Sequence, residues 1–171
     1  MWDDNIGGLI AKHKRTGLLV DTNLLVLLGV GLIRPDIIET SLITRTRFVE
    51  EDFHTLSAFA SEFDKLVITP NILTETSNLL GKLNEPLRSE CLFILGSLVA
   101  VWHEEYVASK LVAQTKEYLR FGLTDAAICT IEEAVYPYLV ITDDWPLYQI
   151  LLHRSVDAIN FNHMRSLRTY L

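Results

Sequence analysis

Five acidic side chains stand at positions where they could act together on one ligand: Asp21, Glu75, Asp125, Asp143 and Asp144. Carboxylates packed against one another repel unless they are protonated or neutralised by a cation. No lysine or arginine stands directly beside any of them in the sequence. A hard divalent cation with oxygen ligands, Mg2+ or Mn2+, is therefore the expected partner. Such an ion could activate water and stabilise the leaving oxygen during hydrolysis of a phosphodiester.

Two of these acidic positions directly follow short apolar runs. Asp21 comes after the run 17–20, and the pair Asp143 and Asp144 comes after the run 138–142. A short, continuous apolar run predicts a strand that is buried on both faces. In an open parallel sheet, ligands bind outside the carboxyl ends of the strands. The acids that end these two strands should therefore lie at the same edge of the molecule.

The other two acids are predicted near helix N-termini. The apolar run 66–69 predicts a strand, and Pro70 opens the helix that carries Glu75. Residues 122–125 form a cap-like start to a helix, with Asp125 at its beginning. Both helices follow connections from the sheet, so their N-termini can face the edge where the strands end. Glu75 and Asp125 can then join the other acids.

Each acid alone has a purely structural explanation. Asp21 and Asp125 could be helix N-caps, Glu75 could face solvent from its helix, and Asp143 and Asp144 could form a solvated turn. The prediction of one shared site depends on the combination, because all five fall where a parallel sheet would gather them at one rim.

The remaining pattern alternates apolar strands with helices. Further helical periodicity covers 6–14, 24–30, 35–63, 86–98, 107–120, 126–134 and 146–152, with a helical tail from 163; 155–161 predicts a last strand, and 99–102 fits either a strand or a helix end. This order predicts an α/β fold, a three-layer α/β/α arrangement around a mostly parallel sheet of four to five strands. No internal repeat or flexible linker interrupts it, so one domain is expected over 1–171.

Composition narrows the functional classes. The net charge of −7 argues against a simple nucleic-acid-binding module, which usually carries a basic surface. It leaves a nuclease open, because carboxylates that load metal ions are themselves acidic. The histidines form no zinc-binding pattern, and no G-x-S-x-G segment supports a serine hydrolase. Two cysteines without CxxC spacing, an acidic N-terminus and no apolar run of bilayer length favour a cytoplasmic protein without a membrane segment.

Four segments, taken in order, resemble the motifs of the PIN-domain superfamily. They are Leu19-Val20-Asp21-Thr22-Asn23-Leu24-Leu25, Val67-Ile68-Thr69-Pro70-Asn71-Ile72-Leu73-Thr74-Glu75, Leu123-Thr124-Asp125-Ala126-Ala127-Ile128 and Val140-Ile141-Thr142-Asp143-Asp144. The last resembles the closing Thr-x-Asp motif of the family, which places Asp144 in the family's acidic position. The resemblance extends over about residues 18–161, and the order of four motifs makes it specific.

The resemblance implies roles for individual residues. Asp21, Asp125 and Asp144 would be metal ligands, and Asp143 would be an additional acid that helps to hold the metal. Glu75 would bind the metal directly or through water, or orient the attacking water. Hydrogen bonds that aim these carboxylates would come from three neighbouring side chains: Thr22, Asn23 and Thr142.

The implied activity is cleavage of single-stranded or structured RNA that depends on Mg2+ or Mn2+. The implied partners are RNA, a small antitoxin-like inhibitor and a second copy of the chain, since many bacterial relatives are toxins held inactive by an antitoxin. Most of those toxins are shorter, and the additional length here falls mainly in 30–64 and 84–118. Two alternatives stay open: a DNA-directed nuclease, and a non-catalytic or regulatory binding module with the same fold.

Basic and aromatic residues are weaker indicators. The basic residues group at 12–15, at 45 and 47, and at 165 and 168, which fits a solvated surface or a track that guides phosphates. The aromatic residues that could stack on bases are Trp102, Tyr136, Tyr138 and Trp145. Trp145 is the best of these, because it directly follows the acidic pair.

Overall fold

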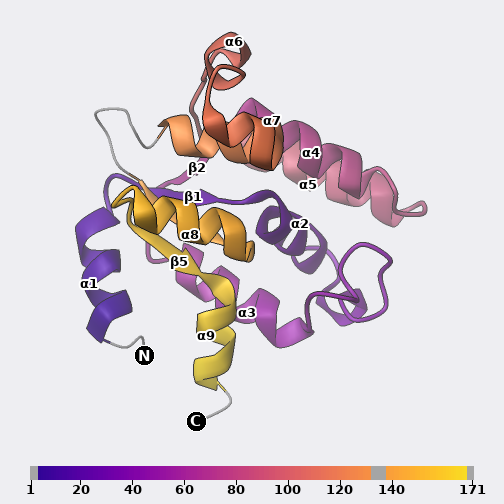
Figure 1. Cartoon of the computed structure of the whole chain (residues 1–171). Coiled ribbons are helices and arrows are strands. Elements are labelled where there is room, and N and C mark those ends of the chain that lie inside the picture. The colour runs from indigo at the N-terminus through magenta and orange to yellow at the C-terminus, as the bar shows by residue number, and fades with distance from the viewer. Residues whose placement is uncertain (1–3, 132–137, 169–171) are drawn as a thin grey trace.

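The computed structural model describes residues 4–131 and 138–168. It has a single sheet of five parallel strands with helices on both sides, which confirms the predicted α/β class. In Figure 1, α4, α5 and α7 lie on one side of the sheet, and α1 and α3 lie on the other.

The strands are β1 (Leu18–Val20), β2 (Leu66–Ile68), β3 (His103–Glu104), β4 (Leu139–Thr142) and β5 (Ala158–Asn160). The helices are α1 (Asp4–His13), α2 (Thr22–Gly31), the short 3-10 helix η1 (Pro35–Ile37), α3 (Glu50–Ala60), α4 (Pro70–Leu80), α5 (Leu87–Val99), α6 (Ser109–Val112), α7 (Lys116–Ile131), α8 (Trp145–His153) and α9 (Phe161–Arg168).

In the strand order β3-β2-β1-β4-β5, strands are added first on one side of β1 and then on the other, although all five run parallel. From β1 the chain moves outward to β2 and β3, and it then crosses back to β4 and β5. The carboxyl ends of β1 and β4 therefore meet at the point where the connections diverge, which is the preferred ligand position in open parallel sheets. Val20 pairs with Ile141 in this register, so Asp21 and Thr142 are the next residues beyond the pair.

The central strands and α2 form the core. All residues of β1 and β4 are buried, as is every residue of α2 except Asn23. Such a helix must be covered on all sides, and α3, α4 and α5 pack against it. A Cβ atom on Gly31 would lie 2.2 Å from the ring of Phe53, so a glycine at this position lets α2 and α3 approach closely. The buried α2 gives the residues at its N-terminus a rigid support.

The segment 35–63, predicted to be helical, is helical only near its two ends, in η1 and α3. Between them, the hydroxyl of Thr44 donates to the carbonyl of Ile38 at 2.6 Å, a side-chain bond that competes with helical backbone pairing. The helix α3 begins where the carboxylate of Asp52 accepts from the backbone N–H of Val49 at 2.9 Å. Helical spacing alone did not reveal the intervening turns.

The predicted helix 107–120 was also wrong in part. The chain forms the short α6 and resumes helix only at α7, because the hydroxyl of Thr115 accepts from the N–H of Tyr118 at 3.3 Å and starts a new helix. The ambiguous segment 99–102 contains the end of α5, and β3 follows it. The predicted helix 126–134 is described as far as Ile131, and its last three residues lie outside the described ranges.

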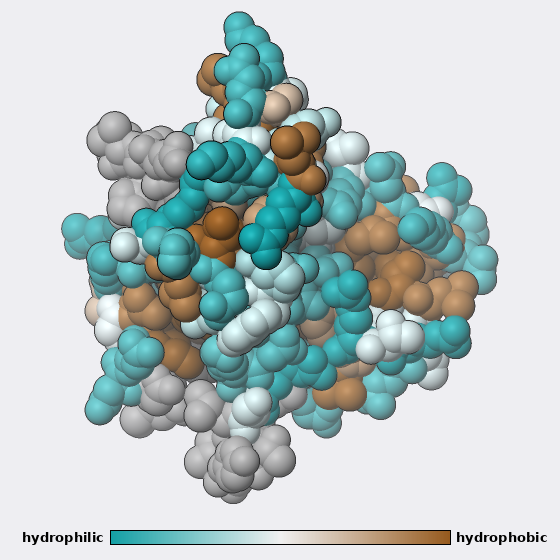
Figure 2. All heavy atoms as spheres, viewed as in Figure 1, coloured by the Kyte–Doolittle hydropathy of each residue, from teal (hydrophilic) through white to brown (hydrophobic). Residues whose placement is uncertain are grey.

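No helix in the described ranges is long and apolar enough to cross a membrane. Figure 2 shows hydrophobic residues reaching this face of the molecule in separate groups among hydrophilic ones. Both cysteines, Cys91 and Cys129, are buried thiols.

Candidate metal site at the acidic rim

Asp21 is fixed at the end of β1 by three hydrogen bonds. Its backbone N–H donates to the carbonyl of Ile141 at 3.1 Å, which continues the pairing of β1 with β4. One carboxylate oxygen accepts from the N–H of Thr22 at 2.6 Å, and the other accepts from the hydroxyl of Thr142 at 2.6 Å. Asp21 thus caps α2, and the sheet register holds its carboxylate beside β4.

Asp144 occupies the corresponding position after β4. Its Oδ1 accepts from the N–H of Leu147 at 2.8 Å, so it caps α8. Its own N–H donates to the hydroxyl of Thr142 at 2.9 Å. This hydroxyl also donates to Asp21, and it therefore links the two acidic turns. The structural role as a cap and the position at the rim coexist in both aspartates.

Glu75 and Asp125 come from α4 and α7, which pack against each other. The hydroxyl of Thr22 donates to Oε2 of Glu75 at 3.4 Å, a long bond that links α4 to the start of α2. Within α7, Gly122 has φ 84° and ψ −175°, so the helix is interrupted and restarts just before Asp125. Glu75 and Asp125 line one pocket. We call the set Asp21, Glu75, Asp125 and Asp144 the acidic rim.

The acids of the rim lie within one another's electric field. The pKa of Asp125 is raised to about 7, chiefly because burial desolvates the carboxyl and also because of the charges of Asp21, Asp144 and Glu75. Burial is also the main cause that raises the pKa of Asp21 to about 6, with smaller contributions from the charges of Asp143 and Asp144. Hydrogen bonds from Thr142 and Thr22 act in the opposite direction. The rim therefore favours protons or a cation.

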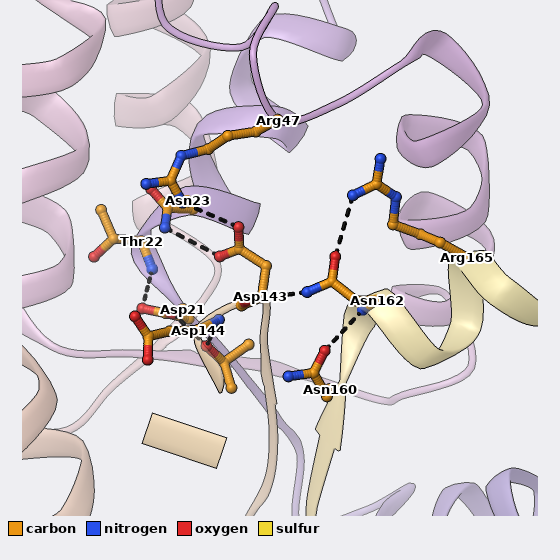
Figure 3. Close-up of polar contacts among 10 residues, drawn as sticks. Asp21, Thr22, Asn23, Arg47, Asp143, Asp144, Asn160, Asn162 and Arg165 are labelled. Atoms are coloured by element: carbon orange, nitrogen blue, oxygen red, sulfur yellow. Dashed lines mark hydrogen bonds and ion pairs between the residues drawn. The ribbon is translucent and has the colours of Figure 1, made fainter. Parts of the chain in front are cut away.

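The carboxylate of Asp143 has other partners (Figure 3). Oδ1 accepts from the side-chain amide of Asn23 at 3.0 Å, and Oδ2 accepts from the guanidinium of Arg47 at 3.1 Å. Its charge acts on Asp21 but is not among those that raise the pKa of Asp125. The ion pair with Arg47 offsets the charge of Asp143 and ties the rim to the turn before α3. Its role as a metal ligand stays a prediction that these contacts do not favour.

The three side chains predicted to aim the acids each donate to one of them. Thr142 donates to Asp21, Thr22 donates to Glu75, and Asn23 donates to Asp143. Thr22 and Thr142 are 4% and 0% exposed, so their hydroxyls are held in place by packing. The bonds are those that a supporting layer around a metal would make.

Two asparagines beside the rim, Asn160 and Asn162, were not predicted from the sequence. The amide of Asn162 donates to the backbone carbonyl of Asp143 at 3.1 Å, and its N–H donates to Asn160 at 2.9 Å (Figure 3). Arg165 donates to Asn162 at 3.1 Å and pairs with the buried Asp52 at 3.1 Å. The pattern Asn160-x-Asn162, which begins at the last residue of β5, was the available signal, since polar residues also follow β1 and β4.

The basic groups separate in the fold. Lys12 and His13 both contact Asp157, at 2.5 Å and 2.6 Å. Asp157 directly precedes β5, so this group lies at the amino edge of the sheet, opposite the rim. Arg47 instead reaches the rim through Asp143, and its side chain is 52% exposed.

The predicted aromatic residues also divide. Tyr138 is buried and its hydroxyl donates to Glu105, while Trp102 packs against the hydrophobic core. Tyr138 therefore offers no free face for a base, and Trp102 is only partly exposed. Tyr136 lies outside the described residues. Trp145 is 53% exposed directly after Asp144, with Tyr148 and His163 beside its ring.

The donor set of the rim fits a hard divalent cation. None of its four carboxylates forms an ion pair with a residue of 4–131 or 138–168, so their charge is uncompensated there. Within the same ranges, no three acidic, histidine or cysteine side chains already stand in an arrangement that could hold an ion. Mg2+ does not require three, because it commonly binds one or two carboxylates and completes its shell with water and phosphate oxygens.

A comparison with models of known protein families and with curated proteins finds no match to this chain.

Proposed function

We propose that this chain is a nuclease of the PIN-domain kind, which hydrolyses RNA phosphodiester bonds in the cytoplasm with Mg2+ or Mn2+. One observation carries the proposal: at the carboxyl edge of a parallel sheet, the charges of Asp21, Asp144 and Glu75 act on Asp125, and none of these four carboxylates has a cationic partner in the described ranges. The raised pKa values of Asp21 and Asp125 support it, because burial, with a smaller contribution from neighbouring acids, disfavours their charged forms in the absence of a cation. The two buried thiols suit a reducing compartment.

Asp21, Asp125 and Asp144 would hold the ion. When bound, it supplies positive charge that polarises the scissile phosphate and makes a water molecule more acidic. Asp144 uses only Oδ1 for capping α8, and the structure gives Asp125 no hydrogen-bond partner in its described part, so oxygens of both are available. Thr142 keeps Asp21 oriented through its 2.6 Å bond.

Glu75 has a different task in the proposed reaction. Its Oε2 accepts the long bond from Thr22, which leaves Oε1 to accept a hydrogen bond from the attacking water. The exposed position of Glu75 on α4 allows water to reach it. Glu75 therefore orients the nucleophile, and the three aspartates hold the ion.

Arg47 would contact the phosphate backbone. Its guanidinium donates to Asp143 through one nitrogen, and the half-exposed side chain keeps further N–H donors for a phosphate oxygen. A cation at this position offsets the repulsion between an acidic protein surface and a polyanion. Asn23 and Asp143 would fix the position of Arg47 relative to the rim.

Cleavage of a fluorescently labelled single-stranded RNA tests the proposal. The full chain is incubated with Mg2+, with Mn2+ and with EDTA, as wild type, Asp21→Asn and Asp125→Asn. Asp36→Asn is the control, since Asp36 is an exposed acid that pairs with Arg34 outside the rim. We expect metal-dependent cleavage by the wild type and the control, and a loss of about 100-fold or more in the rim variants. Equal cleavage by all four proteins, or cleavage in EDTA, would refute the proposal.

Two alternatives make different predictions in the same assay. A DNA-directed nuclease would cleave a matching single-stranded or duplex DNA faster than the RNA. A non-catalytic binding module would bind nucleic acid without cleaving it under any of the metal conditions.

A further inference from the structure

A pocket of about 530 Å3 opens beside the acidic rim. Glu75 and Asp125 stand in its lining, so the pocket begins where the proposed chemistry takes place. The face of α4, the connection from β3 to α6, and α7 around Gly122 form its walls. Its volume falls within the range of small-ligand pockets, which is about 300–1,000 Å3. Apart from Glu75 and Asp125, no residue of its lining takes part in the reaction proposed above.

One wall of the pocket is a polar stripe on α4. Asn71, Thr74 and Asn78 line it at spacings of three and four residues, which places them on the same helix face as Glu75. The opposite face of α4 carries the buried Ile72 and Leu80. The hydroxyl of Thr74 donates to a backbone carbonyl, whereas the amides of both asparagines have donors and acceptors without a partner in the described ranges.

The opposite wall is aromatic. Tyr106 lines the pocket from the connection after β3 and is 77% exposed, so most of its ring is open to a ligand. Phe121 lines it from α7, next to Gly122. Gly122 has a backbone conformation that only glycine adopts readily, and a Cβ there would meet open space. The interruption of α7 shapes the wall and is not a consequence of crowding.

Charge decides what the pocket can hold. The lining residues include Glu75 and Asp125 but no lysine or arginine of the described chain. A phosphate would be repelled in such a pocket, whereas a flat, uncharged group with hydrogen-bonding edges would be accepted. The amides of Asn71 and Asn78 match the edges of a nucleobase, and an exposed tyrosine matches its face.

We propose that this pocket binds an unpaired nucleobase beside the scissile phosphate, with Tyr106 stacking on the base and Asn71 and Asn78 contacting its edge. The inference rests on the proposed nuclease function, and it adds the substrate feature that the same site recognises. A base in a duplex is stacked and paired, so the pocket selects single-stranded RNA at this position.

Binding, measured apart from cleavage, tests the proposal. Fluorescence anisotropy in EDTA and in Ca2+ compares a short labelled single-stranded RNA with a duplex of the same sequence. The variants are Tyr106→Ala, the conservative Tyr106→Phe, and the double variant Asn71→Ala with Asn78→Ala. Phe93→Ala is the matched control, because Phe93 is a 74% exposed aromatic residue on α5 outside the pocket. An abasic site moved along the RNA identifies the base that is bound.

We expect Tyr106→Ala to weaken single-strand binding by about 5- to 150-fold, the effect of losing one base–aromatic stack. Tyr106→Phe and Phe93→Ala should bind as the wild type does. One abasic position should weaken the wild type by a similar factor and leave Tyr106→Ala unchanged, because the two changes remove the same contact. The double asparagine variant should keep most of its affinity and lose its preference among the four bases.

Equal binding by Tyr106→Ala and the wild type would overturn the proposal, as would equal binding of duplex and single strand or no binding of RNA by the wild type. Metal-dependent cleavage without any effect of Tyr106 would reject this pocket and leave the nuclease function standing. Binding that depends on Tyr106, without cleavage in Mg2+ or Mn2+, would reject the nuclease function and leave the base pocket standing.

Discussion

Replacing Asp21 with asparagine changes the charge of the rim while keeping its hydrogen bonds. The carbonyl oxygen of asparagine can accept from the N–H of Thr22, as the carboxylate does. The hydroxyl of Thr142, which donates to Asp21 in the wild type, can turn and accept from the new amide. The variant should therefore fold with the same local geometry and differ from the wild type mainly in that position 21 no longer titrates.

The magnitude follows from the pKa of Asp21, which burial raises from 3.8 to about 6 in the folded chain. A group whose pKa is raised on folding binds its proton more tightly in the folded state. Its contribution to stability is therefore complete below about pH 3.8 and is lost as the pH rises through about 6. At 1.36 kcal/mol for each pH unit, the loss is about 3 kcal/mol in the metal-free protein. Asparagine has no such loss.

Urea unfolding in EDTA at a series of pH values from about 4 to about 7.5 measures this difference. We expect the free energy of unfolding of Asp21→Asn, relative to that of wild type, to increase by up to about 3 kcal/mol over this range. Asp36→Asn provides the comparison, because it changes an exposed acid on the surface. A difference between Asp21→Asn and wild type that stays constant with pH, or that moves in the opposite direction, would refute the assignment of Asp21 as a buried acid with a raised pKa.

Three further substitutions test the support of the rim. Thr142→Val removes the hydroxyl that links Asp21 to the turn at Asp144, and we expect a loss of about 1–3 kcal/mol in unfolding free energy with a fall in cleavage rate; unchanged values of both would contradict the role of this bond. Gly122→Ala forces a non-glycine residue into φ 84°, and we expect a cost of about 1–3 kcal/mol in thermal unfolding together with weaker metal binding at Asp125. If this variant kept the stability and the metal affinity of the wild type, the glycine conformation at position 122 would not be needed to position Asp125. Arg47→Ala should raise KM for RNA, and the affinity of this variant for RNA should fall less steeply with increasing salt than that of the wild type. An effect confined to kcat would argue against a phosphate contact.

Part of the site was accessible from the sequence because local patterns determine it. The apolar runs before Asp21 and Asp144 predict buried strands, and the parallel arrangement then brings both acids to the same edge. Asp125 was predicted from its position at a helix start as well as from the resemblance, whereas Glu75 depended mainly on the resemblance, since a glutamate on a helix is common at protein surfaces. The register that places the hydroxyl of Thr142 against Asp21 follows from the pairing of β1 with β4, and no pattern within one strand determines such pairing.

Other features depend on tertiary packing that no local pattern encodes. Arg47 lies in a turn segment whose path is set by side-chain bonds such as that of Thr44, so its contact with Asp143 was not predictable. The strand β3 has only two residues, both exposed, and carries no apolar run that would indicate a strand. The pocket lined by Tyr106 exists because α4, α7 and the connection after β3 come together. Asn162 was overlooked although the residues after β5 repeat the polar signal seen after β1 and β4.

Anomalous diffraction from crystals of the chain soaked in Mn2+ tests the central claim most directly, because it locates the ion without requiring the right RNA. We expect a manganese peak between the carboxylates of Asp21, Asp125 and Asp144, with Glu75 close enough to reach it through one water, and no such peak in Asp125→Asn. Saturating Mn2+ that leaves this position without anomalous signal, or that binds only elsewhere on the surface, would contradict it.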